Sequence, residues 1–298
     1  MGAELTGAPV VVGRTVLVAT ADGSVVAAGL LDGRARWRFA AGEELALPLA
    51  AGEDVALVAA GTDLFAVDVR TGAERWRGAE LGAISVVVVG DAAYASTGAG
   101  DVLALDLATG AERWRRQVPA AGPLAVADNV VVVATAGGME ALDALTGEPR
   151  WTWSGEGPGP PAPLAVANVV VVDGDAGELI ALALADGTER WRAPSGEATP
   201  RRSGAGAVVV RAGADDLVAV AADTGRIRWR GGPGGAAVAT DGTLVAASVP
   251  NRLTVLDADT GETEGAANLP HSGAEPAPVV AGLQVVVATG RHLLAYTV

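Results

Sequence analysis

The sequence contains no cysteine and no lysine, since all 21 of its basic residues are arginine. Without cysteine there can be no disulfide, no thiolate nucleophile and no cysteine-ligated metal. Without lysine there can be no Schiff base and no Walker-type phosphate-binding lysine. Only two histidines are present, His271 and His292, and neither has a second ligand at metal-binding spacing. We therefore expect no metal, no cofactor and no catalytic residue.

Aromatic residues make up only 4% of the chain, although 50% of its residues are hydrophobic. The core must therefore consist mainly of valine, alanine and leucine, of which valine favours strands. The formal net charge of −14 argues against nucleic acid or an anionic membrane as partner. No apolar run approaches the ~18 residues of a membrane span, and the first residues lack signal-peptide features. We expect a soluble monomer, and export stays open because a signal or anchor can be removed from a longer precursor.

One short stretch recurs along the chain. The letters "TGAERWR" occupy 71–77 and again 109–115, and "DGTERWR" occupies 186–192. Aligned on this stretch, the chain divides into units of 36–40 residues, each with a turn glycine and a tryptophan four residues later. The glycines are Gly33, Gly72, Gly110, Gly147, Gly187, Gly225 and Gly261, and the tryptophans are Trp37, Trp76, Trp114, Trp151, Trp191 and Trp229. Gly265 stands where the seventh tryptophan would be, and Trp153 lies outside the pattern.

Each unit contains four apolar runs separated by Gly, Asp, Asn or Thr, which predicts four strands joined by tight turns. No stretch has sustained helical periodicity. The pattern therefore predicts an all-β fold, an eight-bladed β-propeller of four-stranded antiparallel blades. We expect one propeller domain over 1–298, with blades near 8–40, 48–79, 82–118, 122–154, 162–194, 199–231, 235–268 and 276–298. Residues 2–6 are predicted to complete the last blade, because "GAE" at 2–4 repeats the letters at 72–74.

The repeat assigns a structural task to each of its residues. The aspartate of "ALD" is expected to accept hydrogen bonds from backbone N–H groups of the turn. The alanine two residues before it leaves room for the tryptophan, whose indole we expect to dock one blade on the next. The arginines beside the tryptophan should point to the opposite strand face and pair at the surface with Glu74, Glu112 and Glu189. The stretches "GAGD" at 98–101 and "DGDAGE" at 173–178 are predicted to be hairpin turns rather than nucleotide- or calcium-binding loops.

The segments "ALDLATGAERW" at 104–114 and "ALDALTGEPRW" at 141–151 resemble the tryptophan-docking repeat of the pyrroloquinoline-quinone-like (PQQ-like) propellers. The resemblance covers nearly the whole chain. It departs at four positions, where this sequence has Gly29, Ala183 and Ala221 in place of aspartate and Gly265 in place of tryptophan. The resemblance implies either a quinone- and calcium-binding dehydrogenase or a non-catalytic binding protein similar to the outer-membrane β-barrel assembly lipoprotein.

The non-catalytic branch fits better, because the dehydrogenase branch implies a much longer chain and usually a vicinal cysteine pair. We therefore predict a non-enzymatic scaffold that binds a protein or peptide. A ligand-sensing ectodomain of a larger receptor or kinase is the first alternative, and the quinone protein is the second. The close similarity of the repeats also leaves a recently amplified or engineered propeller open.

Two segments between repeats are longer than the rest, 152–163 and 192–204. The first carries Trp153 and four prolines, and the second carries Arg201 and Arg202. Tryptophan and arginine are enriched at binding hot spots. We therefore predict Trp153, Arg201 and Arg202 as candidate binding residues.

Overall fold

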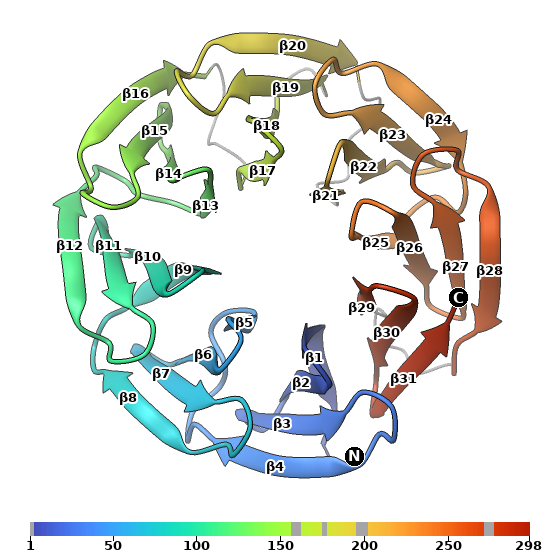
Figure 1. Cartoon of the computed structure of the whole chain (residues 1–298), viewed down its shortest axis with the longest axis horizontal. Helices are drawn as coiled ribbons and strands as arrows, with labels where there is room; N and C mark the ends of the chain where they lie inside the picture. The colour runs from blue at the N-terminus through green and yellow to red at the C-terminus, as the bar shows by residue number, and fades with distance from the viewer. Residues whose placement is uncertain (1–2, 156–161, 175–177, 195–201, 271–276) are drawn as a thin grey trace. The chain divides into compact units, whose positions relative to one another are not determined.

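The described part of the chain consists entirely of short antiparallel strands and their turns. A computed structural model describes residues 3–155, 162–174, 178–194, 202–270 and 277–298, and these contain no helix. The strands form eight sheets in chain order, each with the meander order of a propeller blade (Figure 1). The predicted eight-bladed β-propeller fold is thereby confirmed. The contacts divide the chain into two compact units, Gly2–Pro163 and Leu164–Val298.

The unit Gly2–Pro163 contains the first four blades. Their strands are β1 (Leu5–Val12), β2 (Thr15–Thr20), β3 (Ser24–Gly29) and β4 (Ala35–Ala40); β5 (Ala50–Ala51), β6 (Val55–Ala60), β7 (Asp63–Asp68) and β8 (Glu74–Gly78); β9 (Ala83–Val89), β10 (Ala92–Thr97), β11 (Asp101–Asp106) and β12 (Glu112–Gln117); and β13 (Leu124–Ala127), β14 (Val130–Thr135), β15 (Gly138–Asp143) and β16 (Pro149–Ser154).

The unit Leu164–Val298 contains the other four blades. Their strands are β17 (Leu164–Val166), β18 (Val169–Asp173), β19 (Glu178–Ala183) and β20 (Glu189–Pro194); β21 (Arg202–Ala205), β22 (Val208–Ala212), β23 (Leu217–Ala221) and β24 (Ile227–Gly231); β25 (Ala237–Thr240), β26 (Leu244–Val249), β27 (Arg252–Asp257) and β28 (Thr263–Asn268); and β29 (Ala277–Ala281), β30 (Gln284–Thr289) and β31 (His292–Thr297).

The core of each unit lies between successive blades. The second and third strands of a blade are almost wholly buried, as the runs Thr15–Thr20 and Val55–Ala60 illustrate. Both faces of these strands are covered, so their sequences are continuous apolar runs rather than alternating ones. One buried cluster joins Leu17 and Val25 of the first blade to Val58 and Val67 of the second. Clusters of the same kind join the later neighbours within each unit.

The fourth strand of a blade alternates between covered and exposed residues. In β8, Trp76 is half-buried, whereas Arg75 and Arg77 on either side are exposed. Trp76 is paired with Ala66 of β7, and a register shift follows directly after that alanine. The same pairing of alanine with tryptophan, followed by the same β-bulge, occurs in five other blades. The small alanine is therefore paired with the indole in all six blades that carry the tryptophan. A bulge at this place re-aims the side chains around it.

The last blade differs from the others. Among the described residues it has three strands, in the order β29-β30-β31. The assignment of residues 2–6 to this blade stays a prediction; in the first blade, Leu5 and Thr6 pair with Thr20 and Ala19 of β2. The third strands of the other blades are mostly buried, whereas β31 has only half-buried and exposed residues. No described helix is long and apolar enough to cross a membrane.

Candidate binding surface

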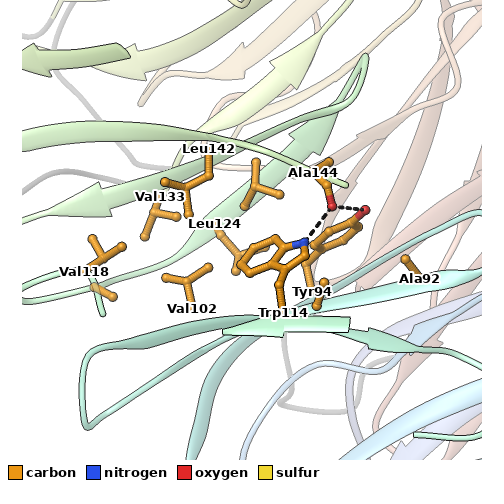
Figure 2. Close-up of a cluster of buried hydrophobic side chains, with 12 residues drawn as sticks. Ala92, Tyr94, Val102, Trp114, Val118, Leu124, Val133, Leu142 and Ala144 are labelled. Atoms are coloured by element: carbon orange, nitrogen blue, oxygen red, sulfur yellow. Dashed lines mark hydrogen bonds between the residues drawn. The ribbon is translucent and has the colours of Figure 1, made fainter. Parts of the chain in front are cut away.

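The tryptophans of the repeat make one contact that recurs between successive blades. Trp114 in β12 donates its indole N–H to the carbonyl oxygen of Ala144, at 2.9 Å, in the following blade (Figure 2). The Tyr94 hydroxyl donates to the same oxygen at 3.2 Å, and its ring lies 6.2 Å from the Trp114 ring. Trp114 is only 9% exposed and packs among Val102, Leu124 and Val133. One indole thus links two sheets through apolar contact and a hydrogen bond.

Four further tryptophans make the same hydrogen bond, each at 2.9 Å. The donors are Trp37, Trp76, Trp191 and Trp229, and the acceptors are the carbonyl oxygens of Val69, Leu107, Ala222 and Ala258. In each case the acceptor residue comes directly after the third residue of the repeated Ala-x-Asp motif, a position that alanine occupies at Ala221. Trp151 is likewise 9% exposed and lies in β16 opposite Ala141.

The five indoles that make this hydrogen bond each lie on the turn glycine of the next blade. At Gly110, a Cβ atom would lie 2.7 Å from the Trp76 ring, and at Gly147 it would lie 2.8 Å from the Trp114 ring. Both glycines have a positive φ, 74° and 73°, which side chains rarely adopt. Glycine is therefore required at these turns by the backbone conformation and by the indole together.

The aspartate of the turn organises the exposed side of each blade. Asp68 accepts hydrogen bonds from the backbone N–H groups of Arg70 and Thr71, which confirms the predicted role of this aspartate. Its second oxygen accepts from the Arg75 guanidinium, at 2.6 Å. The Arg75 hydrogen bond is the main reason that the pKa of Asp68 lies well below its usual value. Arg113 and Arg150 act in the same way on Asp106 and Asp143, and the pKa of each aspartate is lowered to about 2.

Many of the exposed arginines form ion pairs. Arg115 lies 2.7 Å from Glu112 and 2.8 Å from Asp101, and Arg192 lies 3.0 Å from Glu189. The predicted surface pairing with Glu112 and Glu189 is therefore confirmed. The closer partners of several arginines are aspartates across the hairpin, such as Asp63 for Arg77. Guanidinium groups held this way are less available to bind phosphate.

Of the three predicted binding residues, only Trp153 can be placed in full. It lies in β16, is paired with Met139, and is half-buried, with its ring beside Gly155. Arg201 lies outside the described residues, and Arg202 is described only as the first backbone position of β21. A binding role for these three residues therefore stays a prediction.

The other candidate motifs are resolved in part. The stretch 98–101 forms the hairpin turn between β10 and β11, as predicted. The stretch 173–178 joins β18 to β19, and its residues 175–177 lie outside the described part. His292 is exposed at the start of β31, and His271 lies outside the described residues. Within the described ranges, no three metal-ligating side chains come together.

Sequence reasoning missed one buried charge, Arg211 in β22. This side chain is 2% exposed, and its Nη2 lies 3.9 Å from Oδ1 of Asp173. Neither Nη1 nor Nη2 has a hydrogen-bond partner among the described residues. Burial lowers the pKa of Arg211. The signal was present, because the corresponding strand position is apolar in the other seven blades: Val18, Val58, Ala95, Val133, Val172, Ala247 and Val287.

Comparison with known proteins places this geometry in a family context. Residues 1–123, 66–214 and 213–298 match the family model described as outer membrane protein assembly factor BamB. The structure is similar to BamB from Moraxella catarrhalis, with a TM-score of 0.73, 22% identity, and coverage of 97% of this chain and 95% of that one. It is also similar to the computationally designed protein Ika8, with a TM-score of 0.83, 17% identity, and coverage of 100% and 97%.

An enzyme shares the fold at lower similarity. The quinohemoprotein alcohol dehydrogenase from Comamonas testosteroni has a TM-score of 0.67 and 14% identity, and the match covers 95% of this chain and 70% of the enzyme. The sequence matches no curated protein at a significant level. At these identities the structural similarities establish the propeller fold alone, because one propeller architecture hosts unrelated functions.

Proposed function

Since the chain belongs to the family of the outer membrane protein assembly factor BamB, we propose that it is a non-enzymatic propeller that binds a protein or peptide partner. The family match over the whole length of the chain carries this proposal. The name of that family describes a factor in the assembly of outer membrane proteins, and we propose a scaffolding role of this kind for this chain.

The chemistry of the described surface supports the same proposal. The most strongly shifted carboxylates, including Asp68, Asp106 and Asp143, belong to turn and hairpin ion pairs that recur from blade to blade. A catalytic group is normally set apart by its own environment, whereas these groups share one environment. Repeated ion pairs of this kind stabilise turns, and this supports a structural role for these carboxylates.

The contact residues that we propose are Trp153, Arg201 and Arg202. A tryptophan outside the docking register is free to serve recognition, since the repeat does not need it for packing. Arginine adds planar, multidentate hydrogen bonding to such a contact.

The partner is best identified by cross-linking and mass spectrometry, with the wild-type chain compared with the double variant Trp153→Ala/Arg201→Ala. A matched control is Leu145→Ala/Arg113→Ala, which removes one exposed apolar side chain and one exposed arginine outside the predicted segments. We expect the cross-linked partner to be reduced at least ~10-fold by the first variant only. Equal recovery with all three proteins would rule out the proposed contact residues.

The dehydrogenase alternative has its own test, which the fold similarity to the quinohemoprotein enzyme motivates. The purified protein is titrated with pyrroloquinoline quinone and Ca²⁺, and the quinone absorbance is followed. We expect no saturable change. A saturable, calcium-dependent change would favour a quinone protein over the scaffold.

A further inference from the structure

Two carboxylate positions of the repeat neutralise the exposed arginines of several outermost strands. Arg75, Arg113 and Arg150 each pair with the turn aspartate that lies seven residues earlier. Arg115 and Arg192 each pair with the glutamate that lies three residues earlier. At these positions the repeat itself therefore supplies the counter-charges for its arginines.

The blade formed by β21–β24 has lost both carboxylate positions. Ala221 stands in place of the turn aspartate, and Ile227 stands in place of the glutamate. Arg226, directly before Ile227, adds a further positive charge. Residues 221–230 thus contain three arginines and one carboxylate, whereas residues 106–115 contain two of each. The charge of this outer strand and its turn is therefore not balanced within its own repeat.

The arginines of this repeat lie on the surface. Arg226, Arg228 and Arg230 are all exposed, and Arg228 pairs with Asp259 of the following blade. The guanidinium groups of Arg226 and Arg230 have no hydrogen bond and no ion pair to any residue that the structure describes. The side chain of Ile227 is 45% exposed beside them. The outer strand β24 therefore presents unpaired positive charge next to an apolar side chain.

The preceding blade adds a fourth arginine. Ala183 replaces the turn aspartate in that blade, and Arg190, seven residues later, is exposed. Its guanidinium has no hydrogen bond or ion pair within the described part of the chain. Arg190 directly precedes Trp191, whose ring lies on Gly225, and Gly225 directly precedes Arg226. The backbones of Arg190 and Arg226 are therefore each one residue from the same contact between an indole and a glycine.

The turns of these two blades form without the aspartate. The Gly187 N–H donates to Ala183 O at 2.9 Å, and the Gly225 N–H donates to Ala221 O at 2.8 Å. These are the same backbone bonds that close the turns with aspartate, so the alanines change the charge of the surface rather than the turn. Departures from a repeat that packing does not explain are where function is expected.

We infer that an exposed basic stripe binds an acidic, extended segment of the partner protein; the stripe consists of Arg190, Arg226, Arg228 and Arg230. The inference rests on the proposed scaffold function and specifies the chemistry of the partner. Alternate residues of a strand lie about 7 Å apart, so alternate carboxylates of an extended segment match the spacing of Arg228 and Arg230. Each guanidinium can donate paired hydrogen bonds to a carboxylate, and Ile227 offers an apolar contact beside them.

The test uses a blocked, fluorescently labelled octaglutamate peptide and an octaglutamine peptide of the same length. Affinity is measured by fluorescence anisotropy, and NMR shifts locate the bound peptide. The formal net charge of −14 repels an acidic peptide, so binding requires a local excess of positive charge. We expect octaglutamate to bind at least ~10-fold more tightly than octaglutamine, with the largest shifts in β24. The affinity should fall as salt is raised to about 0.15 M, where charges beyond about 8 Å are screened.

Three double variants, which all make the net charge more negative by the same amount, separate the stripe from bulk charge. Ala221→Asp/Ile227→Glu restores both carboxylate positions and keeps every arginine, so it should bind octaglutamate at least ~10-fold more weakly. Arg226→Ala/Arg230→Ala should weaken binding to a similar extent. The matched control is Arg113→Ala/Arg115→Ala, which removes two exposed arginines that have carboxylate partners and should bind as the wild type does.

Three results would overturn the inference. The first is the absence of saturable binding at about 1 mM octaglutamate, and the second is normal binding by Ala221→Asp/Ile227→Glu. The third is tighter binding of an oligonucleotide of eight thymidines than of octaglutamate, which would assign the stripe to nucleic acid. The cross-linking comparison uses Trp153→Ala/Arg201→Ala, which leaves the stripe intact, so the scaffold function is tested separately.

Discussion

Removal of a single repeat tryptophan is expected to weaken the contact between two blades. Trp114 is the most informative position, because its surroundings are fully described and it is 9% exposed. Truncation of a buried tryptophan to alanine typically costs about 3–5 kcal/mol in the free energy of unfolding. The carbonyl of Ala144 keeps the Tyr94 hydroxyl as donor, so the lost indole hydrogen bond adds little to that cost.

Two further variants test this reasoning. Trp114→Phe keeps an aromatic ring against Gly147 and loses only the N–H and part of the ring, so it should cost less than half as much as Trp114→Ala. Trp153→Ala removes a half-buried tryptophan outside the docking register and should also cost less than half as much. Urea unfolding followed by far-UV circular dichroism gives all three values.

The region of the protein that Trp114→Ala destabilises is as informative as the size of the loss in stability. In a repeat architecture each unit is stabilised mainly by its neighbours, so the damage should be local. Hydrogen exchange should accelerate most in β9–β12 and β13–β16, the two sheets that Trp114 joins. A cost below about 1 kcal/mol for Trp114→Ala, or a cost equal to that of Trp153→Ala, would refute the docking role of the repeat tryptophans.

Two other predictions concern charge. The pKa values of Asp68, Asp106 and Asp143 are lowered in the folded protein, so these carboxylates stabilise it above the unfolded pKa of about 3.9, and that stabilisation is lost as the pH falls towards 2. The melting temperature should fall over this window, and Asp106→Asn should make the fall shallower. A melting temperature that stayed constant between about pH 5 and about pH 2 would contradict this. Arg211→Val should lower stability by about 3–5 kcal/mol in urea unfolding, because it removes one member of a buried ion pair and leaves the Asp173 carboxylate without that counter-charge. A loss below about 1 kcal/mol would mean that the pair contributes little to folding.

The blade architecture could be predicted because the units repeat the same arrangement of strands, turn and packing residues. Val-rich runs, the turn glycine and the tryptophan four residues later are local signals, and each is reinforced by the other copies. The ion pairs of the turns could also be predicted in principle, because the aspartate and the arginine are always seven residues apart. The pairs are Asp68 with Arg75, Asp106 with Arg113, and Asp143 with Arg150. The sequence alone indicates only the neighbouring glutamates as partners, because the pairing across the hairpin needs the register to be known.

The residues that bind a partner could be predicted less well than the fold, for a physical reason. A partner contacts a few residues that differ from the repeat, and such residues carry no periodic signal. Arg211 illustrates this, because it is conspicuous only when seven apolar counterparts are aligned with it. Trp153 was identified in the same way, as the one tryptophan outside the register.

A repeat protein thus provides its own internal controls, because its regular copies define what packing requires. Departures from a consistent pattern are where function is expected, because packing alone gives no reason for them.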